Sequence, residues 1–135
     1  MTTAKVAREV CEQEFERFLT AMDLDVDRAG MDEDDRKSLA SAQRIITRAM
    51  ESGNLVINEA GEPVYTPQIG DTSAITFHEP MGATYMAMDT KKQGQNVGKL
   101  YASMADCTHQ PAARFAKMAN RDVKVCQAIV GLFLG

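Results

Sequence analysis

Apolar residues recur at three- and four-residue steps over the first fifty residues of the chain, which is the spacing of one buried face of an α-helix. A first stripe within residues 3–22 contains Val6, Val10, Cys11, Phe15, Phe18, Leu19 and Met22. A second stripe contains Leu39, Ala42, Ile46, Ala49 and Met50 and stops at Ser52-Gly53, where glycine is the usual residue past a helix end. The sequence predicts an antiparallel helical pair over residues 3–52, with Asp32 as the N-cap of the second helix.

The middle of the chain, residues 54–79, predicts a small β-ribbon. The β-rich triplets 55–57 and 64–66 flank a five-residue loop, 58–62, whose length and glycine suit a hairpin. Residues 74–78 predict a third strand. Because Pro63 and Pro67 cannot donate to a hydrogen-bond ladder and the loop is polar, we expect the hairpin, residues 54–67, to lie at an edge, exposed and mobile relative to the helices.

The C-terminal half, residues 81–134, again has helical spacing. Met81, Tyr85 and Met88 form one such set, and a second helix follows from Val97 to Met104. Pro111 opens a short helical segment. Asn120 can cap a last helix, whose stripe contains Val123, Cys126, Ile129, Val130 and Phe133. That stripe is too apolar to be left in water, so it either closes the core, the reading that we favour, or forms a partner surface.

Length and composition fit one globular domain. The chain has 135 residues, of which 44% are hydrophobic and 25% charged. A chain of this size buries enough surface for a single core, and it contains no internal repeat and no low-complexity linker. We therefore expect a mostly α (α+β) fold: one compact helical domain over residues 1–135, with a small antiparallel hairpin or three-stranded ribbon in its middle.

The sequence lacks a recognisable catalytic, metal or nucleotide motif. Asp23, Asp25 and Asp27 match the first ligands of a calcium loop, but the turn glycine and the closing glutamate are missing. The glycines at 94 and 98 are too close together for a phosphate loop. Cys107, His109 and Cys126 could hold a metal only if the fold happened to bring them together. Cys107 and His109 are too close in sequence for a typical cysteine-histidine dyad. We expect reduced, buried thiols, no cofactor and no enzymatic activity.

The distribution of charge limits the partners. The net charge is −4, with 14 acids and 8 bases in residues 1–70 and 5 acids and 7 bases in residues 71–135. Neither half is basic enough to predict a nucleic-acid interface, and solvation and capping account for the acids on helix faces and at helix starts. No apolar run reaches the length of a membrane span, and no secretory segment opens the chain. We therefore expect an intracellular protein without membrane contact.

Residues 74–134 resemble the tail assembly chaperones of long-tailed bacteriophages. The similarity lies in a strand that ends in a polar turn with proline (residues 75–80, ITFHEP), a following helical segment with an acid near its end (residues 81–89, MGATYMAMD), and a last helix that begins near Asp122 and closes with Phe133-Leu134. Asp89 and Asp122 are the matching acids. The two N-terminal helices are not part of the resemblance.

The resemblance implies a non-enzymatic protein of phage or prophage origin that binds the hydrophobic tape-measure protein and recruits tail tube subunits in the cytoplasm of the bacterial host. Methionine suits adaptable binding surfaces, so the expected partner-binding residues are Met81, Tyr85, Met88, Ile129 and Phe133. A homo-oligomer would be compatible with this role. The alternative is a small structural component of the virion, such as a head-tail completion or connector protein, that forms a stable ring; an enzyme comes third.

Overall fold

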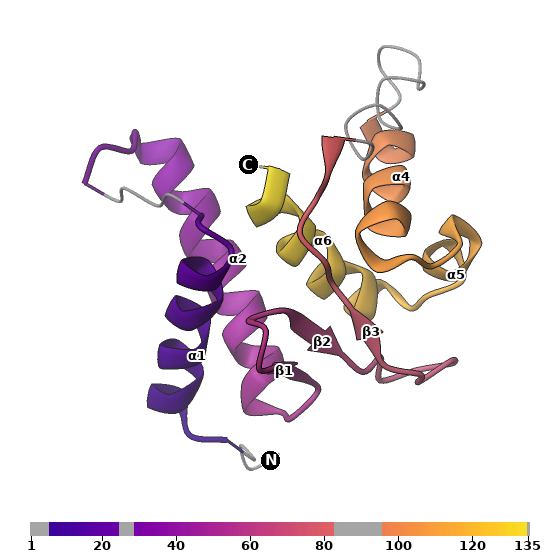
Figure 1. Cartoon of the computed structure of the whole chain (residues 1–135), viewed down its shortest axis with the longest axis horizontal. Coiled ribbons are helices and arrows are strands. Elements are labelled where there is room, and N and C mark those ends of the chain that lie inside the picture. The colour runs from indigo at the N-terminus through magenta and orange to yellow at the C-terminus, as the bar shows by residue number, and fades with distance from the viewer. Residues whose placement is uncertain (1–5, 25–28, 83–95, 135) are drawn as a thin grey trace.

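The N-terminal part of the chain forms two antiparallel helices, as the computed structural model shows (Figure 1) for the residues that it describes, 6–24, 29–82 and 96–134. Helix α1 spans Arg8–Ala21, and helix α2 spans Glu33–Glu51. The predicted pair is confirmed, although α1 begins later than its apolar stripe. Val6 lies before the helix, where its N–H donates to the carbonyl of Glu51 at 3.2 Å and ties the start of α1 to the end of α2.

Both ends of α2 follow the sequence signals. At the start, Oδ1 of Asp32 accepts a hydrogen bond from the N–H of Asp35 at 2.8 Å, and the first turn is acidic, as the helix dipole favours. At the end, Gly53 has a φ of 83° and donates its N–H to the carbonyl of Met50 at 3.0 Å. A residue with a side chain would be strained in this left-handed conformation.

Three short strands form an antiparallel sheet in the order β1-β2-β3, with bounds Leu55–Ile57, Pro63–Tyr65 and Ile75–Thr76. The expectation that the prolines mark an edge is wrong for Pro63, because β2 is the central strand. Pro63 is the first residue of that strand, so its missing N–H falls where the ladder begins. Its carbonyl still accepts from the N–H of Phe77 at 2.8 Å.

One face of the sheet belongs to the core. Leu55 lies opposite Tyr65, and Tyr65 lies opposite Ile75. These three side chains are at most 1% exposed, and Phe77 beyond β3 is fully buried, whereas Val56 on the other face is 54% exposed. The expectation of an exposed ribbon is therefore wrong for the face that carries Tyr65. The mobility of residues 54–67, which was inferred from the two prolines and the polar loop, stays a prediction.

The turn between β1 and β2 packs against the end of α1 through Gly61. This glycine has a φ of 84°, and a Cβ built on it would lie 2.2 Å from Cβ of Ala21. We expect Gly61→Ala to lower the free energy of unfolding by about 3 kcal/mol in urea denaturation, because left-handed strain and overpacking add.

The matched control for this substitution is Gly70→Ala. Gly70 has a similar φ of 77°, but nothing lies within 4 Å of the added Cβ. Gly70→Ala should therefore lower the free energy of unfolding only by the backbone strain, about 1–2 kcal/mol. Equal losses at the two positions would show that the α1 contact has no energetic weight.

The C-terminal part contains helices α4 (Asn96–Thr108), α5 (Ala112–Ala116) and α6 (Asn120–Leu134). In Figure 1, α6 lies between the α1–α2 pair on one side and α4 and α5 on the other. These helices confirm the prediction of a helical C-terminal half, and α6 begins at the residue that was expected to cap it. The predicted helical segment with Tyr85 and Met88 lies outside the described residues. Among the helices in the described ranges, none combines the length and the apolar character needed to cross a membrane.

A single cluster of buried side chains joins these elements into a mostly α fold with a small central sheet. It includes residues of both N-terminal helices, the sheet and the three C-terminal helices. Phe18 of α1 meets Phe133 of α6 edge to face, with ring centroids 5.5 Å apart and an interplanar angle of 89°. The first and last described helices of the chain therefore share one core.

Candidate functional site

The structure separates the five residues that were expected to bind a partner. Met81 is 73% exposed. Tyr85 and Met88 lie outside the described residues. Ile129 is fully buried, and Phe133 is 8% exposed. A surface role for these last two is therefore corrected to a core role, because α6 turns its apolar stripe inward, toward α2 and α4.

The cysteines are buried and free, as expected. Burial raises the pKa of the Cys107 thiol to about 11 and the pKa of the Cys126 thiol to about 12. Both thiols are therefore protonated at neutral pH and are weak nucleophiles and weak metal ligands. Within the part of the chain that the structure describes, no group of three or more His, Cys, Asp and Glu is placed to hold a metal ion.

The two histidines lie together beside the hairpin loop. Their rings stack with centroids 4.6 Å apart, and Nδ1 of His78 lies 2.7 Å from Oε2 of Glu62. Partial burial raises the pKa of Glu62, but the hydrogen bonds from His78 and Asn58, together with the charge of His78, outweigh this effect and hold the pKa below its usual value. The contact links the hairpin loop to the segment that follows β3.

Because its folded-state pKa is lowered, Glu62 stabilises the fold above the pKa of its unfolded form, and this stabilisation is lost as the pH falls through the folded pKa. We expect Glu62→Gln to cost at most about 1 kcal/mol at pH 6, since the pair is partly solvated. The difference in free energy of unfolding between the variant and the parent should disappear as the pH falls below about 4. Urea denaturation of both proteins at pH 6 and below about pH 4 measures this difference. The control is Glu59→Gln in the same turn, which should leave the free energy of unfolding unchanged. If the loss caused by Glu62→Gln persists at low pH, the shape of the Glu62 side chain contributes to stability and its charge does not.

Asp122, in the first turn of α6, is fully buried and connects α6 to the sheet. Its Oδ1 accepts from the Tyr65 hydroxyl at 2.5 Å and from the N–H of Gln68 at 2.8 Å, and its Oδ2 accepts from the N–H of Ile69 at 3.3 Å. Burial, reinforced by the adjacent carboxylate, raises the pKa of Tyr65, so the phenol stays protonated and donates. In the sequence, only the resemblance singled out Asp122. The prediction that solvation explains the acids at helix starts is wrong for this buried carboxylate.

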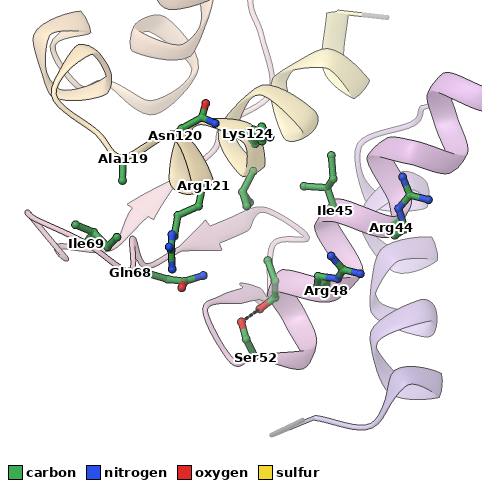
Figure 2. Close-up of a pocket in the computed structure, with 12 residues that line it drawn as sticks. Arg44, Ile45, Arg48, Ser52, Gln68, Ile69, Ala119, Asn120, Arg121 and Lys124 are labelled. Atoms are coloured by element: carbon green, nitrogen blue, oxygen red, sulfur yellow. Dashed lines mark hydrogen bonds between the residues drawn. The ribbon is translucent and has the colours of Figure 1, made fainter. Parts of the chain in front are cut away.

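A cleft between α2 and α6 gathers four cations. Arg44 and Arg48 come from α2, and Arg121 and Lys124 come from the first turns of α6. Figure 2 shows Arg121 reaching from α6 toward Gln68, with Arg44 and Arg48 along α2. All four are exposed, and among the described residues none of them forms an ion pair. No acidic side chain lines the cleft, because Asp122, next to Arg121, points into the core.

The floor and ends of the cleft are apolar and amide-rich. Ile45, Ala49 and Val125 contribute apolar surface between the two helices, and Ile69, 48% exposed, adds to it from the loop after β2. Gln68 and Asn120 offer side-chain amides. The Ser52 hydroxyl, by contrast, donates to the carbonyl of Ala49 at 2.8 Å (Figure 2). The cleft has a volume of about 620 Å³ and is open to solvent, so it can receive a peptide segment or a small anion.

Sequence reasoning missed this site because its residues are far apart in the chain. Arg44 and Arg48 are one turn apart on α2, and Arg121 and Lys124 are three apart on α6, so each pair shares a helix face. That spacing was the available signal. Only the packing of α2 on α6 reveals that the two pairs converge.

The lining of the cleft presents cations, amides and apolar groups. It includes the Ser52 hydroxyl and the Lys124 amine but no carboxylate, imidazole or thiol. Comparison of the chain with protein-family models, with curated proteins and with solved structures gave no match.

Proposed function

We propose that this protein is a non-enzymatic tail assembly chaperone of a long-tailed phage or prophage, which binds the tape-measure protein and recruits tail tube subunits in the host cytoplasm. The observation that supports this most is the cleft between α2 and α6, with exposed cations above an apolar floor. Such a surface suits a polypeptide segment that has apolar anchors and acidic flanks. The resemblance of residues 74–134 to this family suggests which polypeptide it is.

The chemistry of the cleft fits a chaperone that releases its client. Exposed charges give fast, salt-sensitive association but modest affinity, and the floor is too small to bury a long apolar face. Met81, 73% exposed, offers a further unbranched apolar contact outside the cleft. A client held in this way would stay soluble and could still be handed to the growing tail.

Co-expression with the tape-measure and tail tube genes of the same genome tests the proposal. We expect the tape-measure protein to co-purify with the parent chain and to be lost with Arg44→Glu/Arg48→Glu. The matched control is Arg36→Glu/Lys37→Glu, which makes the same change of charge at exposed positions nearer the start of α2 and should retain the client. If no client co-purifies and the chain is found as a stable ring within assembled particles, the structural alternative, a head-tail completion or connector protein, is correct.

A further inference from the structure

The two walls of the basic cleft are helices that lie alongside each other. In Figure 1, α2 and α6 run in opposite directions, and the two helices pack against each other. The cations of α2, Arg44 and Arg48, are one turn apart, and the cations of α6, Arg121 and Lys124, are three positions apart. Residues at these spacings share one face of a helix. Each wall of the cleft therefore carries a short row of positive charge.

The apolar residues of the cleft lie deeper than its cations. Ala49 and Val125 are only 6% and 7% exposed, whereas the four cations are exposed. In three places an exposed cation directly precedes an apolar residue of the lining: Arg44-Ile45, Arg48-Ala49 and Lys124-Val125. Successive helical residues point in different directions around the axis, so the apolar member can face the neighbouring helix while the cation stays at the rim. The cleft thus has an apolar floor between two basic rims.

A complementary ligand needs an apolar face toward the floor and acidic groups toward both rims. A strand points its side chains in two opposite directions, so with an apolar face on the floor its acids would point into solvent. The walls are also helices, whose backbone groups are bonded within each helix, and they offer no strand edge to pair with. A helix projects side chains all around its axis and can meet the floor and both rims at once.

We propose that the basic cleft binds an amphipathic helix whose apolar stripe has acidic residues on both of its flanks. In a heptad written abcdefg, positions a and d would meet the floor, and acids at e and g would meet the two rims. The cleft of about 620 Å³ receives the side chains of the stripe, and the bound helix lies above it. The inference rests on the proposed function only in assigning this helix to the tape-measure protein.

The apolar floor favours this occupant over a nucleic acid or a free phosphate. Either of these would pair with the cations but would leave the floor without a partner. Ile69, at one end of the cleft, is 48% exposed and would be covered by an apolar anchor but not by a phosphate. Because the rims are exposed charges, binding should also be sensitive to salt.

The first test is the binding of a fluorescent peptide to the purified parent chain, measured by anisotropy. The peptide has about three heptads with Leu at a and d and Glu at e and g, since shorter isolated helices are marginal and the like charges oppose pairing of the peptide with itself. We expect saturable binding that increases the helical circular dichroism of the peptide.

Three comparison ligands make this test specific to a helix with acidic flanks. A peptide with Lys at e and g, a peptide of the first composition with Leu and Glu in strict alternation, and a single-stranded DNA oligonucleotide should each bind at least about 10-fold more weakly. If the alternating peptide or the oligonucleotide binds as well as the helical peptide, the proposal is wrong. A parent chain that does not bind the helical peptide overturns it too, whether the cleft is empty or closed by a second copy.

Reversing the charge of one rim forms the second test. Arg44→Glu/Arg48→Glu should weaken binding of the acidic peptide by about 30-fold, because two attractions become repulsions. A peptide with Lys on one flank and Glu on the other should bind this variant to within about 3-fold of the original pair. A peptide of the same composition with Lys and Glu mixed along both flanks should not restore binding. Equal binding of these two peptides would mean that the bound peptide does not lie between the rims.

Two further variants complete the second test. Arg36→Glu/Lys37→Glu makes the same change of charge at exposed positions outside the cleft and should bind the acidic peptide like the parent. Arg121→Glu/Lys124→Glu reverses the other rim and should respond to the peptides as the α2 variant does. It replaces the α2 variant if circular dichroism shows that the latter does not fold.

The peptide assay and the co-expression assay can fail independently. If the peptide binds as expected but no tape-measure protein co-purifies, the cleft is a site for an acidic helix and the chaperone function is wrong. If the tape-measure protein co-purifies and the peptide does not bind, the chaperone function stands and the helical occupant of the cleft is wrong.

Discussion

Asp122→Ala should lower the free energy of unfolding by about 3 kcal/mol. The alanine leaves the buried Tyr65 hydroxyl without its acceptor and releases the backbone N–H groups of Gln68 and Ile69. A buried donor that loses its partner costs its full desolvation, which exceeds the net value of an ordinary hydrogen bond. Urea denaturation followed by circular dichroism measures the loss.

Tyr65→Phe is the matched control, because it removes the hydroxyl and leaves the carboxylate its two backbone donors. It should cost about 1–2 kcal/mol. When Asp122→Ala is made in the Tyr65→Phe background, its loss of unfolding free energy should be about 1–2 kcal/mol smaller than in the parent. In that background no hydroxyl is left without its acceptor. Strict additivity of the two losses would mean that the hydrogen bond between these side chains does not contribute to stability.

Ile129→Asp should abolish the cooperative thermal melt. Ile129 is fully buried in the cluster that joins α6 to the rest of the core. An unpaired carboxylate there costs several kcal/mol, a large part of a total stability of about 5–15 kcal/mol. Calorimetry or thermal circular dichroism would show a broad, non-cooperative transition or none.

Gly131→Asp controls for the added charge on the same helix. A Cβ at this exposed glycine would meet nothing within 4 Å, so the new side chain points into solvent. Gly131→Asp should lower the free energy of unfolding by no more than about 1 kcal/mol. If Ile129→Asp melts like this control and still binds its partners, the helix packs differently from the structure described above.

The helices could be predicted because their signals are local. The stripe that includes Phe15 and Phe18 follows from helical periodicity, and the start of α2 follows from the capping geometry of Asp32. The hairpin was equally readable from its loop and its β-rich triplets. Periodicity and capping depend on residues at most a few positions apart, so one sequence suffices to read them.

The position of the sheet in the core could not be read in the same way. Pro63 suggested an edge because proline lacks a donor, but its place at the first residue of β2 makes that loss tolerable, and β3 pairs on the other side. The burial of Tyr65 depends on Asp122, 57 residues further along the chain. A contact of this range leaves no periodic trace in the sequence.

The candidate site was missed for a related reason. Apolar and methionine-rich positions such as Ile129 were chosen as partner residues because hydrophobicity marks both cores and interfaces, and the sequence alone does not distinguish the two. The cations of the cleft, by contrast, are ordinary surface residues until α2 packs on α6. Average charge over half of the chain also concealed a local basic surface within an acidic protein.

The two backbone hydrogen bonds to Asp122 have a further consequence for the thermodynamics of association. They fix Gln68 and Ile69, which form one end of the cleft, to the same helix turn that carries Arg121. A loop held in this way before any partner arrives has little conformational entropy left to lose when the cleft fills. Ordering a mobile loop would otherwise oppose binding. A contact made mainly of exposed charges can therefore form without that entropic penalty on the α6 side, and the main adjustment on binding falls on the long arginine side chains of α2.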